Sequence, residues 1–205
     1  MKTILFIALC GFVLLPSAFG GSIDFETAAP CDFSGTTALT NAYAGLGVTF
    51  SGPGGNNGGA ILDQCGNFSG INAHSGVDFL AFNAGAQMKD GGVPTGPETI
   101  LFTTPESGVG IWVGGIGTTY TLQAFDVFGN LLGSASILPP SGQWSQLTIN
   151  TASISSLVLS FDQRDAVVDD LTWNGGGSVP EPSTLALLGL GMAALAGFAR
   201  RRRSL

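Results

Sequence analysis

The sequence predicts an all-β protein, an antiparallel β-sandwich of the jelly-roll type, and three observations favour it. Apolar and polar residues alternate with a period of two in short segments such as Thr119–Phe125. Turn-forming residues interrupt these segments at the spacing of about 8–12 residues that is typical of sandwiches. No amphipathic helical pattern separates the two apolar ends of the chain. The expected strands are Ser22–Glu26, Gly47–Phe50, Ala60–Asp63, Asp78–Asn83, Glu98–Thr103, Val109–Val113, Thr119–Asp126, Leu131–Ile137, Trp144–Ile149, Ile154–Phe161 and Val167–Trp173.

The first 20 residues, Met1–Gly20, have the organisation of a signal peptide. A single lysine, Lys2, precedes the short apolar run Ile4–Leu15, and Ala18-Phe19-Gly20 supplies small residues at the cleavage positions. The run is shorter than a spanning helix, so we expect cleavage before Gly21 rather than a retained membrane helix. The domain that follows is therefore expected outside the cytoplasm.

The expected domain, residues 21–173, is long enough for one hydrophobic core and is strongly acidic. Of the 14 acids, 13 lie in Gly21–Gly177, where Lys89 and Arg164 are the only lysine and arginine. Phosphate binding requires a basic surface, so nucleic acid is excluded as a partner. An acidic surface favours solubility and can attract divalent cations.

Cys31 and Cys65 remain after signal removal and are expected to form a disulfide in an oxidising compartment. A catalytic cysteine is not expected, because the chain has a single histidine, His74, and no recognisable second partner. The nucleophile-elbow pattern G-x-S-x-G and the zinc motif H-E-x-x-H are both absent. A glycosidase needs only two facing carboxylates, and nothing in the sequence pairs two of them.

Acidic residues occur in both the first and the last expected strand: Asp24 and Glu26 in one, Asp169 and Asp170 in the other. If these strands lie side by side, the carboxylates can supply the oxygen ligands that Ca²⁺ prefers. Two adjacent aspartates face the same side of a strand only where a bulge intervenes. The alternative is that all four acids face solvent or cap turns.

The tryptophans are the other candidate ligand-binding residues. Trp112 and Trp173 lie within apolar strands and are expected in the core. Trp144 follows a polar turn, so we expect it to be the most exposed and the one able to contact a sugar ring. His74 lies in a polar segment and is expected to be a solvated loop residue.

The C-terminal region has three parts that follow a Gly/Ser-rich linker at residues 174–178. Val179, Pro180, Glu181 and Pro182 come first, and the flanking prolines keep Glu181 in an extended segment. An apolar run over residues 183–199 follows and forms a marginal transmembrane helix. The basic cluster stops transfer and is expected to stay in the cytoplasm. It consists of Arg200, Arg201, Arg202 and Arg203.

This three-part order, over residues 179–205, resembles the PEP-CTERM sorting signal of Gram-negative bacteria. The resemblance implies recognition near Glu181 by an exosortase, a membrane cysteine transpeptidase, with transient anchoring in the inner membrane. Release to the cell surface or extracellular matrix would follow. A plain C-terminal anchor is the alternative.

Four segments of the domain are similar to exported jelly-roll domains that resemble galactose-binding-like and carbohydrate-binding modules. This resemblance implies a structural calcium at Glu26 and one of Asp169 or Asp170. We therefore expect a non-enzymatic exported protein; the alternatives are a module that binds exopolysaccharide and, third, a hydrolase. The segments are Ile23–Glu26, Thr37–Phe50, Leu122–Asp126 and Val168–Trp173.

Overall fold

The computed structural model describes residues 20–29, 31, 37–39, 41–53, 59–66, 70–82, 96–162 and 166–175. The expected signal peptide, the sorting motif, the apolar run and the arginine cluster lie outside these residues. Within the described ranges, no helix is long and apolar enough to cross a membrane.

The described chain is all-β, with two short 3-10 helices, as the sequence predicts. The first five strands are short: β1 (Gly21–Ile23), β2 (Thr37–Ala38), β3 (Val48–Ser51), β4 (Gly59–Asp63) and β5 (Asp78–Phe82). The later strands are β6 (Glu98–Gly114), β7 (Tyr120–Phe125), β8 (Leu131–Ile137), β9 (Ser145–Phe161) and β10 (Val167–Gly175). The 3-10 helices are η1 (Ala44–Leu46) and η2 (Gln64–Gly66).

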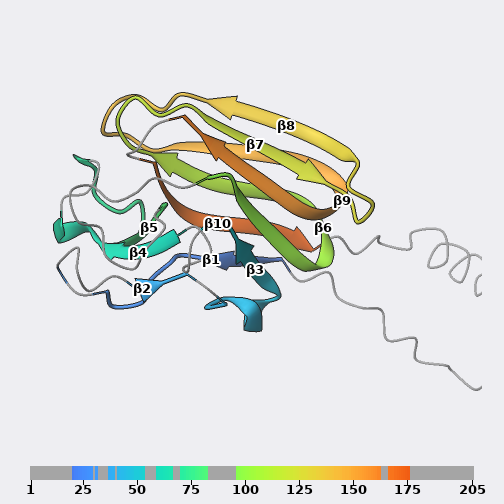
Figure 1. Cartoon of the computed structure of the whole chain (residues 1–205), viewed down its shortest axis with the longest axis horizontal. Coiled ribbons are helices and arrows are strands. Elements are labelled where there is room, and N and C mark those ends of the chain that lie inside the picture. The colour runs from blue at the N-terminus through green and yellow to red at the C-terminus, as the bar shows by residue number, and fades with distance from the viewer. Residues whose placement is uncertain are drawn as a thin grey trace, which may run out of the picture.

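All strand pairings are antiparallel, and the main order is β2-β4-β5-β10-β6-β9-β7-β8. β1 pairs with β10 and β3 pairs with β6. The first and last strands are therefore neighbours, which is the arrangement that the calcium prediction required. In Figure 1, β7 and β8 lie in an upper layer, above β10, β1 and β3.

The two 17-residue strands β6 and β9 connect the two layers of the sandwich. The first part of β6, from Glu98 to Leu101, pairs with β9 residues that also pair with β7. Its second part, Gly108–Val113, pairs with β9 and with β10. Register shifts around Glu106 separate the two parts, because bulges let a strand bend from one layer into the other. The sequence analysis expected two strands in place of each.

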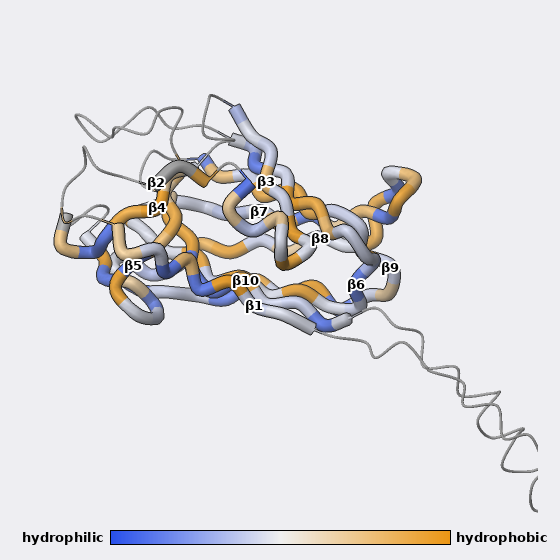
Figure 2. Tube along the Cα trace, turned by 90° about the horizontal axis from the view of Figure 1, so that it is seen from below, coloured by the Kyte–Doolittle hydropathy of each residue, from blue (hydrophilic) through white to orange (hydrophobic). Residues whose placement is uncertain are grey.

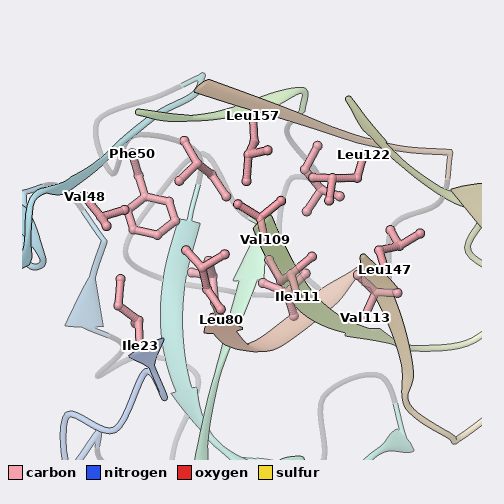
Figure 3. Packing of buried hydrophobic residues seen from close by; sticks show 14 of the residues in the cluster. Ile23, Val48, Phe50, Leu80, Val109, Ile111, Val113, Leu122, Leu147 and Leu157 are labelled. Carbon is pink, nitrogen blue, oxygen red and sulfur yellow. The ribbon is translucent and has the colours of Figure 1, made fainter. Parts of the chain in front are cut away.

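The hydrophobic core lies between the layers and follows the period-two pattern. Val109, Ile111 and Val113 of β6 are at most 2 % exposed, and Figure 3 shows them near Leu122 and Leu147. The hydropathy colouring in Figure 2 is most hydrophobic along β4 and over part of β10. Burial of one face and exposure of the other fixes the strand register.

Three local predictions concern the ends of elements. The sequence predicts turn-forming residues between the strands, and the turn after β7 contains Gly129 with a φ of +80°. The disulfide between Cys31 and Cys65 is present, with Cα atoms 5.5 Å apart. β1 ends at Ile23, before the expected Glu26, because Phe25 has a φ of +57°, which ends extended pairing.

Candidate functional site

The segment after β1 and the start of β5 exchange hydrogen bonds through two carboxylates. Glu26 Oε1 accepts the backbone N–H groups of Val77 and Asp78 at 2.8 and 2.9 Å. Asp78 Oδ2 accepts the N–H groups of Thr27 and Ala29 at 2.9 and 3.0 Å. Each carboxylate therefore accepts backbone N–H groups of the other segment. Glu26 thus has a structural role, because it holds the two segments together.

Asp78 is the acidic residue of this region that sequence reasoning missed. Its side chain is fully buried, and within the described chain its Oδ1 atom has no hydrogen-bond partner. The Tyr43 hydroxyl is likewise buried without a partner there. Burial is the main cause that raises the pKa of Tyr43, and the charges of Asp24, Asp78, Asp169 and Glu26 add to it. Four carboxylates are thus near enough to act on one buried hydroxyl group.

β10 contains the bulge that two adjacent aspartates need in order to lie on one side of a strand. Val168 and Leu171 both face the core, and the register against β6 shifts between Asp169 and Thr172. The extra residue, Asp170, has a φ of +42°. Asp169 and Asp170 therefore both lie on the outer side of the sheet, between two core-facing residues.

The two aspartates hold the segment that contains His74. Asp169 Oδ2 accepts the N–H groups of His74 and Ser75 at 2.8 and 3.2 Å. Asp170 accepts the Ser75 hydroxyl at 2.8 Å and pairs with His74 Nδ1 at 2.5 Å. Burial raises the pKa of Asp169 to about 7, although the backbone N–H donors act against it.

His74 also belongs to an aromatic cluster with two tryptophans. Its ring stacks on Trp112 with centroids 3.9 Å apart, and it meets Trp144 edge-on at 5.9 Å. The Trp144 indole N–H donates to the carbonyl of Asn72 at 2.9 Å. Trp173 is buried as expected, with 8 % exposure. Trp112 is only half-buried, and its ring lies against His74 rather than in the core, which differs from the expectation for both residues.

The position of Trp112 could have been recognised from its spacing in β6. Val109, Ile111 and Val113 are core residues, so Trp112 must face outward. His74 could not have been assigned in this way, because its contacts depend on a 95-residue separation from Asp169.

One other group has metal-ligand geometry. Among the described residues, ligand atoms of Cys31, Asp63 and Cys65 lie within 4.8 Å of one another. The two sulfurs are joined in the disulfide and provide no thiolate, so this group is not a candidate metal centre. Asp63 instead accepts the Cys65 N–H at 2.7 Å.

Comparisons with known proteins identify the tail and the fold. Residues 178–203 match the model of the PEP-CTERM protein-sorting motif. A cleaved adhesin domain of Lys-gingipain from Porphyromonas gingivalis has a similar structure, with a TM-score of 0.50 and 15 % identity, covering 78 % of this chain and 99 % of that one. No curated protein matches the chain in sequence.

Two further solved structures are more distantly similar. A DUF4465 family protein from Bacteroides caccae has a TM-score of 0.40 and 12 % identity, with 80 % of this chain and 95 % of that one covered. TmCBM61, solved with β-1,4-galactotriose, has a TM-score of 0.35 and 16 % identity, with 68 % and 94 % covered.

Proposed function

We propose that the chain is a non-enzymatic protein of the cell surface or extracellular matrix, delivered there by exosortase processing of its C-terminal signal. The match of residues 178–203 to the sorting motif carries the proposal. The adhesin domain with a similar fold supports a role in contact rather than catalysis.

In this proposal the signals at the two ends of the chain act in a fixed order. The signal peptide over residues 1–20 directs export, and the apolar run over residues 183–199 holds the chain in the inner membrane. Arg200–Arg203 remain in the cytoplasm because transfer of four arginines across the membrane is strongly unfavourable. The exosortase acts near Pro180, Glu181 and Pro182 on the outer side and frees the domain from the anchor.

The mass of the mature C-terminus tests this proposal. We expect the full chain, expressed in a host with its exosortase, to lose Arg200–Arg203. The Glu181→Ala variant, or the wild type in a host without the exosortase, keeps the arginines. If the wild type retains them beside an active exosortase, the tail is a plain membrane anchor and the proposal fails.

A second candidate function is carbohydrate binding, with exopolysaccharide as the partner. The observation that favours it is the cluster of Trp112, His74 and Trp144, three partly exposed rings in which His74 contacts both tryptophans. Aromatic rings of this kind supply flat apolar surface beside polar groups. Trp144 is the expected point of contact, as the sequence analysis proposed.

We also propose that Ca²⁺ binds between β10 and the segment after β1, at Asp24, Glu26 and one of Asp169 or Asp170. The buried, unpartnered Oδ1 of Asp78 supports the proposal, because a buried carboxylate oxygen without a donor is costly unless a cation is near. The chemistry fits, since Ca²⁺ takes six to eight oxygen ligands. Within the described chain, three of these acids do not converge to within 4.8 Å as they stand, so binding requires side-chain movement.

Thermal unfolding of the purified protein tests the calcium proposal. We expect Ca²⁺ to raise the melting temperature and a chelator to reverse the change. Asp24→Asn should reduce the shift, because it removes the charge of one proposed calcium ligand. The change should disturb the fold little, since Asp24 is exposed and accepts the N–H of the nearby Glu26. Asp63→Asn, at the disulfide, is the matched control. Identical melting curves with Ca²⁺ and with chelator would remove the proposal.

A further inference from the structure

The outer face of β6 has glycines where its neighbours have polar side chains. Gly108 and Gly110 alternate with the core residues Val109 and Ile111, so both glycines lie on the outer side. The outward residues beside these glycines are exposed and polar, both on β9 and in the second half of β10. The result is a trough along β6, called here the β6 trough, with a cavity of about 110 Å³. Its polar walls are formed by Gln146, Thr148, Asn150, Thr172 and Asn174.

Strand register sets these residues opposite one another. Gly108 is the partner of Asn150 on one side and Asn174 on the other. Gly110 lies in the same way between Thr148 and Thr172. A methyl group added at Gly108 would lie 2.8 Å from Asn150 Oδ1 and 3.0 Å from Asn174 Nδ2. The side-chain amides of Asn150 and Asn174 therefore lie close to the backbone of Gly108, which has no side chain to separate them from it.

Most of the polar side chains in these walls have no hydrogen-bond partner among the residues that the structure describes. Among the described residues, the side chains of Gln146, Thr148, Asn150 and Asn174 make no hydrogen bond, whereas the Thr172 hydroxyl donates to the Gly110 carbonyl at 3.3 Å. Each side-chain amide offers donors and an acceptor on one planar group. Three amides and two hydroxyls are thus gathered around a glycine floor, and four of these five side chains are free to bind.

The chemistry of the walls selects the kind of ligand. No charged residue lines the trough, and the domain around it is acidic, so an anionic ligand is disfavoured. The lining is too polar for a lipid chain. A peptide strand has no backbone to pair with, because β6 is already paired on both sides. A neutral ligand rich in hydroxyl groups matches amide donors and acceptors.

The aromatic cluster lies beyond one end of the trough, farther along β6. Trp112 is the next outward residue of β6 after Gly110, and His74 lies on its ring. From Gly108 to Trp112 the strand rises about 13 Å, which accommodates a few sugar rings. A ligand in the trough can therefore contact both the amides and the aromatic rings.

We propose that the β6 trough binds a short segment of a neutral saccharide chain, with Asn150 and Asn174 hydrogen-bonding its hydroxyl groups over the glycine floor. This inference rests on the carbohydrate-binding function proposed above and names its site and ligand class. The cavity is small and shallow beside ordinary ligand pockets of about 300–1,000 Å³, so binding is weak for one copy. Many copies on one surface then gain strength from multivalency.

Affinity electrophoresis of the full chain, purified in a zwitterionic rather than a sugar-based detergent, tests the inference. The probes are soluble neutral glucan, galactan and mannan, with polygalacturonate as the acidic comparison. We expect at least one neutral polysaccharide to retard the protein and polygalacturonate not to do so. The double variant Asn150→Ala, Asn174→Ala should weaken this retardation at least 10-fold. Gln123→Ala, an amide on β7 outside the trough, is the matched control and should change nothing.

A filling variant separates the trough from the aromatic cluster. Gly110→Val places a side chain in the trough, and the atoms that it meets, Gln146 Nε2 and Thr172 Oγ1, belong to exposed side chains. We expect Gly110→Val to lose binding with an unchanged melting temperature.

If Trp144→Ala abolishes binding while both trough variants bind normally, the inference that the trough is the binding site is wrong. The proposal that the protein binds carbohydrate is then supported, with the aromatic cluster as the site. If no neutral polysaccharide binds, both ideas fail, and the C-terminal mass still decides the sorting proposal.

Discussion

Two tyrosines with buried hydroxyl groups show how differently such a group can contribute to stability. The Tyr120 hydroxyl donates its one hydrogen to the Gly114 carbonyl at 2.5 Å, lies 3.0 Å from the Val167 carbonyl, and accepts the Val167 N–H at 2.7 Å. It therefore joins β6 to β10 at the point where the two layers meet. The Tyr43 hydroxyl has no partner among the described residues. The same atom supports the fold at one position and adds only a desolvation cost at the other.

Removal of each hydroxyl group should show this difference. We expect Tyr120→Phe to lower the free energy of unfolding by about 1–3 kcal/mol, because it leaves buried backbone groups of Val167 and Gly114 without their partner. Tyr43→Phe should be neutral or slightly stabilising in calcium-free buffer. Urea denaturation of both variants measures the two changes. Equal losses would contradict the hydrogen-bonding account.

Glu98 makes stability depend on pH in an unusual direction. It is 1 % exposed, and neither carboxylate oxygen has a hydrogen-bond partner in the described part of the chain. Burial raises its pKa from 4.5 to about 8. The folded protein then keeps the proton between these values while the unfolded chain releases it, so stability falls as pH rises through this window and is level above it.

The comparison of wild type with Glu98→Gln isolates this effect. We expect the free energy of unfolding of the wild type, relative to the variant, to fall between about pH 4.5 and 8 by no more than about 5 kcal/mol. The difference between wild type and variant does not contain the contribution of Asp169, whose pKa is also raised, because both proteins have this residue. A difference that does not change with pH would show that Glu98 ionises freely in the folded protein.

At the scale of elements, the disulfide joins the segment before β2 to the 3-10 helix after β4. These short strands lie at one end of the sheet order, where β2 pairs with β4 alone among the described strands. Cys31 and Cys65 are 34 residues apart, so the bond restricts a large loop of the unfolded chain. The edge of the sheet depends on this covalent link more than the centre does.

Loss of the disulfide should therefore destabilise the domain through its edge. We expect Cys31→Ser with Cys65→Ser to lower the free energy of unfolding by about 3–4 kcal/mol in the chain-entropy model. Hydrogen exchange should increase in β2 and β4 before it does in β6 and β9. Uniform loss of protection over all strands would contradict this localisation.

The sequence predicted most of the strands because the period-two pattern is local, but it missed the two-residue strand β2. β7 and β8 lie within one or two residues of their expected bounds, and each has alternating apolar residues followed by a turn. The continuity of β6 and β9 was not predicted, because the interruption at Glu106 looks like a turn in sequence but is a bulge within one strand. Bulges depend on the partner strand, and the partner cannot be deduced from local pattern.

The candidate sites were predictable to different degrees for the same reason. The neighbouring positions of β1 and β10, and the need for a bulge at Asp169 and Asp170, followed from strand geometry. Asp78, His74 and the β6 trough did not, because they depend on contacts between segments that are far apart in the chain. Gly110 was expected within a strand, but its place in the floor of the trough depends on the polar residues of β9 and β10 beside it.

At the scale of the whole molecule, basic residues are concentrated at the ends of the chain and acidic residues in its middle. The chain carries a net charge of −7, and five of its seven basic residues lie in the two terminal regions that the proposed processing would remove. These residues are Lys2 and Arg200–Arg203. The net charge of a processed protein that keeps Glu181 is therefore −12, and that of one that loses it is −11. The mature domain is then acidic, which suits a soluble surface layer and repels nucleic acid.

Isoelectric focusing should detect this change in a single step. We expect the wild type to focus at a lower pH than the Glu181→Ala variant in the same exosortase-containing host, because only the wild type loses its four C-terminal arginines. The substitution itself removes one acid, so the variant must be compared with its own form from a host that lacks the exosortase. In that host both proteins keep the arginines and differ by one charge alone. A wild-type protein that focuses at the same pH in both hosts would contradict processing at the motif.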